Sequence, residues 1–492
     1  MNRFNKTGRL FHLPVLFVIL MLIDCSGGKE KMPITTTSDE ALGLFVEGRD
    51  FSERLWTREA IDRFDKAIAI DSEFAMAHLY RALVATSPKE YFEYLDKAGT
   101  LVDKASEAER LIILGVEAGN HANPMQQLEY YRKLVELYPD DERARFWLVN
   151  HYFSQQEYNL VAEEAEKIID INSKFSPIYN QLGYAYRFLG DYENAEKAFQ
   201  KYIKLIPDDP NPYDSYADLL MKMGKYGESI ESYYKALKLD ETFAASHIGI
   251  AANLNYLDKY EDARDQLREL YDLAADDGLR RNALLAIAVS YVDEGKLEQA
   301  IETIDEAYIL AEGAGDAAAM ANDLVQKGYI YLEMEKYKKA GEVFNRALQV
   351  IEESSLQEEI KVNARRNRLY NQTRLSLLKH DLKTARDNSI EFRKQVEEIN
   401  NPNQIRRAHE LAGLIALEEG NYDMAIAEFR QTSQQNPLNL FFMARSYQGK
   451  GDVEKTKEWL KNTVEFNSSI NMAYSLVRKK AKRMLAQLEQ RN

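Results

Sequence analysis

The hydrophobic positions of this chain follow a helical pattern from residue 39 onward. Apolar and small residues recur every three to four positions, so that they share one face of an α-helix. Short polar segments that begin with glycine, such as Gly190-Asp191, separate these stretches and predict tight turns between two helices. In the clearest pair, the two predicted apolar faces carry Tyr179, Leu182, Gly183 and Tyr186, and then Ala195, Phe199 and Tyr202.

The helix pairs repeat with a nearly constant period. Counted from Gly183, a small residue follows after 12 positions, an aromatic residue after 16 and a proline after 24. The same offsets recur from Gly413 and in part from Gly48, Gly115 and Gly328. The origins of the first seven copies lie 33 or 34 residues apart, and later ones lie 31 to 45 residues apart. About twelve copies of one helix hairpin predict an all-α solenoid, because a single hairpin cannot bury its own apolar face.

This pattern resembles the tetratricopeptide repeat, whose signature is a Trp- or Tyr-led first helix with Leu-Gly-x-x-Tyr, followed by Ala-x-x-x-Phe and Pro. The positions that match are Tyr179, Leu182-Gly183, Tyr186, Ala195, Phe199 and Pro207. The resemblance covers roughly residues 39–468 and implies an α–α superhelix in the form of an elongated stack. It also implies a non-enzymatic scaffold that offers a concave groove to peptide segments of partner proteins.

The chain is predicted to comprise five regions. They are a signal peptide (1–24), a tether or linker (25–38), a regular repeat array (39–278), an array with helices longer by one or two turns (279–468) and a capping helix (469–492). The capping helix has an apolar stripe through Val477 and Ala481 for the last hairpin. Its basic residues, including Arg478, Lys479 and Lys480, are expected to face solvent, with anionic lipid or a partner as the alternative.

The amino terminus has the pattern of an export signal. The apolar run from Leu13 to Ile23 follows a basic start, and its eleven residues are too few for a membrane-spanning helix, which needs about twenty. The only cysteine, Cys25, follows at once, and the arrangement resembles a bacterial lipoprotein signal. The resemblance implies that Cys25 is lipidated and anchors the protein to a membrane of the bacterial cell envelope. Asp24 stands where that family has Gly, Ala or Ser, so the alternative is a chance cysteine after an uncleaved anchor.

Composition and motifs argue against catalysis by this chain. There are 79 acidic and 64 basic residues, and the net charge of −15 disfavours nucleic-acid binding. One cysteine excludes an intramolecular disulfide and a multi-cysteine metal site. The seven histidines form no zinc-protease pair, and no phosphate-binding glycine loop or nucleophile elbow is present, so we expect no cofactor, metal or catalytic residue. Many of the 30 tyrosines occupy packing positions of the repeat, an interpretation that we favour over an aromatic platform for glycans.

The first helix of each hairpin supplies the candidate binding residues. Positions −6, −3, +1 and +4 from each origin point away from the second helix, toward the concave side of the stack. Around the best-matched copies these positions are Phe146, Asn150, Phe153, Asn180, Tyr184, Arg187, Asp214 and Asp218. Amides can bond an extended peptide backbone and aromatic rings can bury its side chains, although an ordinary water-filled face is the alternative. No lysine is among them, so we do not expect the Lys–Asn clamp that some repeats of this family use for a terminal carboxylate.

Three functions stay open on the sequence alone. We favour a lipid-anchored scaffold with protein or peptide partners. A glycan-binding surface lipoprotein is the second, although the large irregular insertions of such helical-repeat proteins are missing from this sequence. The third is a regulatory or sensory subunit of an envelope complex whose enzyme is a separate chain.

Overall fold

The computed structural model describes residues 31–490, so the predicted signal peptide and Cys25 lie outside the described residues. Within this range the chain forms 25 α-helices, one short 3-10 helix (Val102–Lys104) and no strand. The first 24 α-helices pair into twelve hairpins, and α25 follows as the last helix. The predicted all-α superhelix of about twelve hairpins with a final helix is confirmed.

The hairpins follow one another in chain order. The first seven are α1 (Asp39–Glu53) with α2 (Thr57–Ile70), α3 (Ala75–Leu83) with α4 (Pro88–Thr100), α5 (Glu107–Asn120) with α6 (Pro124–Leu137), α7 (Glu142–Ser154) with α8 (Tyr158–Ile171), α9 (Ser176–Leu189) with α10 (Tyr192–Leu205), α11 (Pro210–Lys222) with α12 (Tyr226–Leu239), and α13 (Ala244–Tyr256) with α14 (Tyr260–Leu273). The other five are α15 (Asp277–Glu294) with α16 (Leu297–Gly313), α17 (Ala317–Glu333) with α18 (Tyr337–Glu353), α19 (Glu358–Leu378) with α20 (Leu382–Glu398), α21 (Pro402–Glu418) with α22 (Tyr422–Phe429), and α23 (Pro437–Lys450) with α24 (Val453–Val464). The chain then forms α25 (Met472–Glu489). Helices α15 to α21 have 17 to 21 residues, whereas α1 to α14 have 9 to 15 and α22 to α24 have 8 to 14.

A glycine in the first helix and a ring in the second set the distance between the two helices of a hairpin. A Cβ atom added at Gly183 would lie 2.5 Å from the ring of Phe199, and one added at Gly413 would lie 2.8 Å from the ring of Phe429. Both rings are fully buried. The origin of the repeat is therefore small because the aromatic side chain sixteen positions later packs directly on its backbone.

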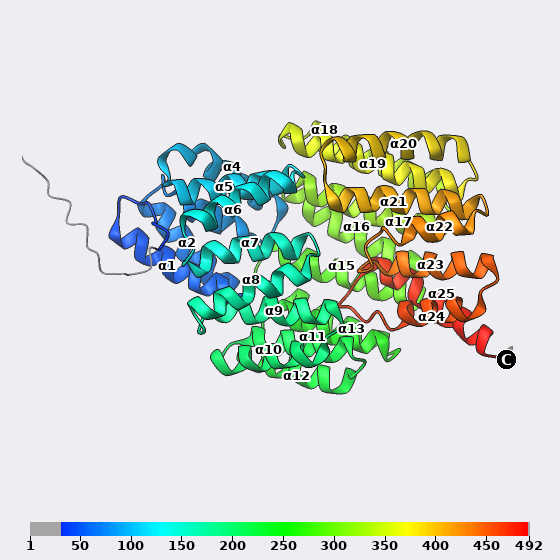
Figure 1. Ribbon diagram of the computed structural model, residues 1–492, viewed down its shortest axis with the longest axis horizontal. Coiled ribbons are helices and arrows are strands. Elements are labelled where there is room, and N and C mark those ends of the chain that lie inside the picture. Colours follow the sequence, from blue (N-terminus) through cyan, green and yellow to red (C-terminus); the bar gives the residue numbers. More distant parts are fainter. Residues whose placement is uncertain (1–30, 491–492) are drawn as a thin grey trace, which may run out of the picture.

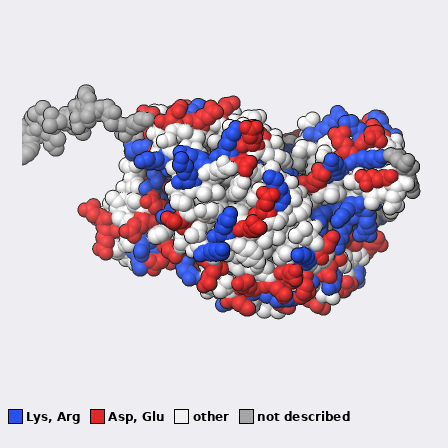
Figure 2. Space-filling model, turned by 90° about the horizontal axis from the view of Figure 1, so that it is seen from below, with Lys and Arg blue, Asp and Glu red and all other residues white. Residues whose placement is uncertain are grey.

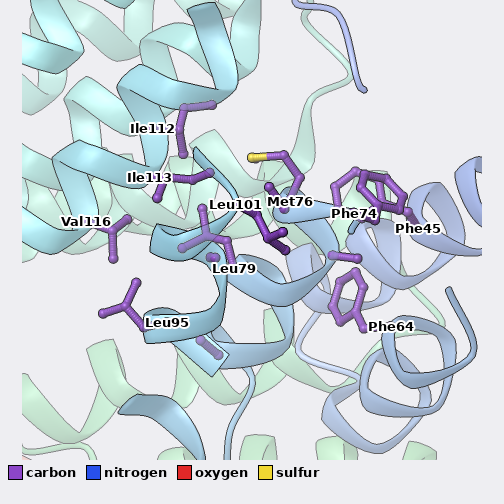
Figure 3. Packing of buried hydrophobic residues seen from close by; sticks show 14 of the residues in the cluster. Phe45, Phe64, Phe74, Met76, Leu79, Leu95, Leu101, Ile112, Ile113 and Val116 are labelled. Carbon is purple, nitrogen blue, oxygen red and sulfur yellow. The ribbon is translucent and has the colours of Figure 1, made fainter. Parts of the chain in front are cut away.

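Neighbouring hairpins share one hydrophobic core. At the front of the array, Phe45 of α1 contacts Phe64 of α2 and Phe74 at the start of α3, with ring centroids 5.9 and 4.9 Å apart. The same cluster continues through Leu79 of α3 and Ile112 of α5 (Figure 3). Each hairpin thus covers the apolar face of the next, as the period of the sequence predicts.

The rear half of the array returns alongside the front half, and we call the contact between the two halves the seam. Figure 1 shows hairpins up to α12 on one side of the molecule and those from α16 to α24 on the other. At the seam, the turn that joins the two helices of a front hairpin contacts a loop that joins one rear hairpin to the next helix. The bonds that define it are Lys89 N to an Asp316 carboxylate oxygen (2.9 Å), Asn401 Nδ2 to Ala122 O (2.7 Å), Arg406 Nη2 to Gln155 O (3.0 Å) and Tyr226 Oη to Asn467 Oδ1 (2.9 Å).

The seam makes the array shorter and broader than a single row of hairpins. Its bonded partners are 227 to 279 residues apart in the chain, so one superhelical turn takes roughly seven hairpins of the observed period. The sequence analysis predicted an elongated stack. This prediction is wrong, because successive turns of the superhelix lie side by side and bond each other at the seam. Segments far apart in the sequence can therefore line one hollow.

One basic residue of the last helix is buried at the seam, whereas Lys482 stays exposed. Helix α25 packs on α24, α23 and α15, and its apolar residue Val477 is buried as predicted. The expectation of a solvated basic face is wrong for Arg478, which is 5% exposed and pairs with Asp293 of α15 at 2.6 Å. Lys480 likewise contacts Glu333 of α17 at 2.6 Å. The reason is that α25 does not end an open stack, since α15 of the neighbouring turn covers it.

Charges of both signs are mixed on the surface. On the face in Figure 2, Lys and Arg side chains lie among Asp and Glu side chains without one large field of a single sign. On this face, recognition of a partner therefore depends on local chemistry more than on long-range attraction.

Candidate functional site on the inner face

First helices of the hairpins line the inner face of the array, and two of the hollows there contain predicted binding residues or part of the predicted tether. The smaller one, the front groove, has a volume of about 280 Å³ and lies against α1, α3, α5 and α7. The larger one, the central pocket, has a volume of about 1090 Å³ and lies between front helices and the rear segments around α24. The residues of the central pocket that matter below are Phe153, Asn180, Gln181, Tyr184, Arg187, Phe188, Asp218, Lys222, Gln434, Trp459, Asn462, Glu465, Phe466 and Asn471.

The eight residues predicted for the concave groove have two different environments. Five of them line the central pocket: Phe153, Asn180, Tyr184, Arg187 and Asp218. The other three have partners in the next hairpin: Phe146 packs edge-on against Phe175 (5.3 Å between centroids), Asn150 accepts a bond from Gln181 (3.1 Å) and Asp214 accepts one from Ser246 (2.7 Å). The contacts of these three residues hold neighbouring hairpins together.

Asp218 lines the central pocket, and a second carboxyl group, that of Asp214, lies near it. The hydroxyl of Tyr184 donates to one oxygen of Asp218 at 2.9 Å, and the hydroxyl of Tyr233 donates to the other. Asp214 lies beside this group and is 7% exposed. Burial, with the charge of Asp218, raises the pKa of Asp214 well above its usual value. Both oxygens of Asp218 are thus occupied, so this carboxylate shapes the floor of the pocket.

Two cations lie at the wall of the same pocket. The Arg187 guanidinium lies over the rings of Tyr184 and Phe188, with 5.8 and 5.1 Å from its central carbon to the ring centroids. Lys222 donates from Nζ to the backbone oxygen of Phe466 at 2.6 Å. Burial, and next the charge of Arg187, lower the pKa of Lys222 to about 8. The two cations therefore influence each other across the pocket wall.

Sequence reasoning missed Lys222 and every residue that the rear half contributes. Lys222 stands one position beyond the +4 site of its copy, at the end of α11, so a search one residue wider would have included it. Gln434 and Trp459 belong to the last copies of the repeat, and Asn471 begins the last helix, α25. Only the seam brings them to the pocket, and no local pattern in the sequence indicates the seam.

Part of the predicted tether, residues 31–34, lies against the array and forms one wall of the front groove. Residues 31–37 have no helix or strand and run across the first helices of the front hairpins. Met32 and Ile34 pack on the front core, in the hollow lined by Tyr80 and Trp147. This part of the chain is therefore held against the array, which the sequence did not indicate.

Three carboxylates hold the backbone of residues 31–37. The N–H groups donate from Met32 to Asp141 (3.0 Å), from Thr35 to Glu109 (2.7 Å) and from Thr37 to Asp71 (2.9 Å). Two of these acceptors stand at the N-terminal ends of α7 and α5, and the third follows α2. Hydrogen bonds from backbone N–H groups to a charged acceptor are strong, and they do not depend on which side chains the bound segment carries. The front groove is thus built to bind a peptide backbone.

The described residues contain neither a membrane span nor a metal cluster. None of the helices between residues 31 and 490 combines the length and the apolar character that crossing a membrane requires. In the same range, no three side chains of His, Cys, Asp or Glu come together in a way that could hold a metal ion.

Comparison with protein families identifies the repeat unit. The tetratricopeptide repeat family matches residues 176–209, 211–243 and 324–353. These segments are the hairpins α9–α10 and α11–α12 and most of the hairpin α17–α18. In these three hairpins the chain matches the tetratricopeptide repeat. The resemblance carried by Gly183 and Phe199 is confirmed for these hairpins.

Similar proteins share the repeat over part of their length. A TPR repeat-containing protein of Methanocaldococcus jannaschii is 26% identical over 230 residues, which are 37% of this chain and 39% of that protein. A general transcriptional corepressor of Dictyostelium discoideum is 26% identical over 137 residues, 27% of this chain and 10% of that protein. A solved structure from the functional characterisation of Pseudomonas aeruginosa pilF is 18% identical with a TM-score of 0.31, over 45% of this chain and 91% of that one. The chain spans less than half of the length of these two curated relatives, and the shared repeat supports a protein-interaction scaffold.

Proposed function

We propose that this protein is a lipid-anchored, non-enzymatic scaffold whose inner face binds extended segments of partner proteins. The observation that carries the proposal is the front groove, which holds residues 31–37 of its own chain through their backbone. A groove that bonds N–H groups and offers a shallow apolar hollow can accept peptides of varied sequence. First helices of successive hairpins present this groove and the central pocket on the inner face of the array, and only α7 lines both.

The proposed anchor is close to the front groove along the chain. Six peptide bonds separate Cys25 from Lys31, and this length reaches at most about 20 Å when fully extended. A lipid on Cys25 would therefore hold the front groove near a membrane of the bacterial envelope. A partner in the same membrane would then have a raised effective concentration at the groove.

Cys25→Ala is expected to release the protein from the membrane fraction or to stall its processing, because the acceptor of the lipid is gone. Metabolic labelling with a fatty acid, followed by fractionation of the envelope, measures both effects. Ser26→Ala is the matched control and should keep the label. An alanine variant at position 25 that retains the fatty acid would show that the anchor is elsewhere.

Ile34→Asp is expected to loosen residues 31–37 from the front groove, because a charged carboxylate cannot replace an apolar contact. The vacated groove should bind a labelled peptide with the sequence of residues 31–38, as measured by fluorescence anisotropy on the full chain. Adding Asp71→Asn should weaken binding of this peptide at least about tenfold, or about 1.4 kcal/mol, since a neutral amide replaces the charged carboxylate that accepts from the Thr37 N–H.

The control for this experiment is an exposed position on a second helix. Glu163→Lys on α8, added to the Ile34→Asp chain, should leave the affinity for the peptide unchanged. Equal weakening by Asp71→Asn and Glu163→Lys, at unchanged helicity, would mean that the groove does not recognise a peptide backbone.

A further inference from the structure

The central pocket contains a buried cation for which the described part of the chain supplies no anion. Arg187 is 7% exposed, yet its guanidinium takes part in no ion pair or hydrogen bond with any of residues 31–490. Its Nε atom is among the buried polar atoms that lack a partner. A buried charge without a partner is strongly unfavourable, so such an arrangement is expected where a ligand completes the pair.

The carboxylates that line the pocket form no ion pair with Arg187. Asp218 already receives hydroxyl groups on both oxygens. Glu465 is exposed and lies 3.8 Å from Lys461. Lys222 adds a second positive charge, and its one described hydrogen bond leaves further N–H groups on the ammonium. The guanidinium of Arg187 is therefore left without an ion-pair partner among residues 31–490, and a planar carboxylate matches it in shape.

Amide groups and one indole surround these cations. The side-chain oxygens of Asn180 and Gln181 are buried without a hydrogen-bond partner among the described residues. Asn462 and Asn471 face the same space from the rear half, together with Trp459. Amides both donate and accept, which suits neighbouring hydroxyl groups, and the flat face of an indole suits the apolar side of a sugar ring.

We infer that the central pocket binds a small acidic sugar. Its carboxylate pairs with Arg187 and Lys222, and its hydroxyl groups bond the amides on both sides of the seam. The volume of about 1090 Å³ is sufficient for a short oligosaccharide. This site goes beyond the scaffold function and does not depend on the front groove, because none of its residues contacts residues 31–37.

The test uses the full chain with glucuronic and galacturonic acid as probes and glucose as their neutral counterpart. Trp459 is one of three tryptophans, and the other two, Trp56 and Trp147, do not line the central pocket. We expect a saturable change in tryptophan fluorescence with the uronic acids and at least tenfold weaker binding of glucose. Trp459→Phe should abolish the fluorescence change, whereas calorimetry should still detect binding of the uronic acids.

Substitutions at the cation then test its role. Arg187→Gln should weaken uronic-acid binding at least tenfold, Arg187→Lys should give an intermediate affinity, and Arg110→Gln, an exposed change on α5, should have no effect. Circular dichroism confirms that each variant keeps its helices. Any of the following would overturn the inference: no saturable binding of the uronic acids, equal affinity for glucose or inorganic sulfate, an undiminished affinity of Arg187→Gln, or binding of an acidic peptide in place of the sugars.

Discussion

Arg478→Met is expected to lower the free energy of unfolding by about 3–5 kcal/mol. Arg478 and Asp293 are 5% and 3% exposed, and the guanidinium donates to the two carboxylate oxygens at 3.1 and 2.6 Å. A third bond goes to the backbone oxygen of Asn255 at 3.1 Å. The variant leaves Asp293 buried without its cation, so nothing offsets the cost of removing that carboxylate from water. Urea unfolding, followed by circular dichroism, measures the loss.

The loss of stability in Arg478→Met should depend on pH in one direction. Burial raises the pKa of Asp293 above its usual value, although the hydrogen bond from Arg478 acts against this shift. Without Arg478 that pKa rises further. A carboxyl group whose pKa is higher in the folded state contributes its full stability when protonated, and this stability is lost as the pH rises through the folded-state pKa. The variant should therefore approach wild-type stability as the pH falls from about 7 toward about 4.

Two further variants separate the buried pair from a general effect of charge. Arg478→Met combined with Asp293→Leu is expected to recover most of the lost stability, because no charge then remains buried. Arg268 and Asp265 form an exposed pair, with side chains 48% and 65% exposed, so Arg268→Met should cost at most about 1 kcal/mol. If Arg478→Met costs no more than Arg268→Met, α25 is not buried against α15 in solution.

The repeat could be predicted from the sequence because its causes are local. Gly183 and Phe199 are sixteen positions apart, and they contact each other within one hairpin. The same helical spacing places the apolar face of each hairpin against the next one. A contact pattern of this kind recurs in every copy, so weak copies can be found from strong ones. The hairpin number and the final helix follow from the same reasoning.

The seam could not be predicted because its causes are not periodic. The bond between Asn401 and Ala122 joins residues 279 positions apart, and it depends on the small rotation that every hairpin adds to the superhelix. Arg478 looked like a solvated residue of a terminal helix, since a basic residue on the polar side of a capping helix usually faces water. Its burial follows from the return of the array, which no single repeat encodes.

The candidate site shows the same division between local and distant causes. Asn180 and Arg187 were found because their offsets in the first helix place them on the inner face of α9. Trp459 and Asn471 were missed, since they reach the pocket from the rear half across the seam. The hydrogen bond from Ser246 of α13 to Asp214 of α11 depends on how two neighbouring hairpins are placed relative to each other. The spacing of residues along the chain does not give that placement.

Gly183→Leu is expected to lower the free energy of unfolding by about 3 kcal/mol or more. A Cβ atom at this position would lie 2.5 Å from the ring of Phe199, and the ring is fully buried, so it has no free space to enter. Overpacking of this kind forces side chains off their rotamers and moves the backbone. Gly227→Leu on α12 is the matched control, because an added Cβ atom there meets nothing within 4 Å. This control should gain about 0.5–1 kcal/mol, since leucine favours a helix more than glycine does.

The effect of Gly183→Leu should be concentrated near α9 and α10, because each repeat of a solenoid contacts mainly its neighbours. Helix α9 also carries Asn180 and Arg187, so the variant should weaken uronic-acid binding in the central pocket. Peptide binding in the front groove of the Ile34→Asp chain should be affected much less, since none of the residues that line that groove belongs to α9 or α10. Hydrogen exchange measures the spread of the damage and should rise most in α9 and α10. Equal acceleration in all helices would contradict local propagation, and it would mean that the seam joins both halves into one cooperative unit.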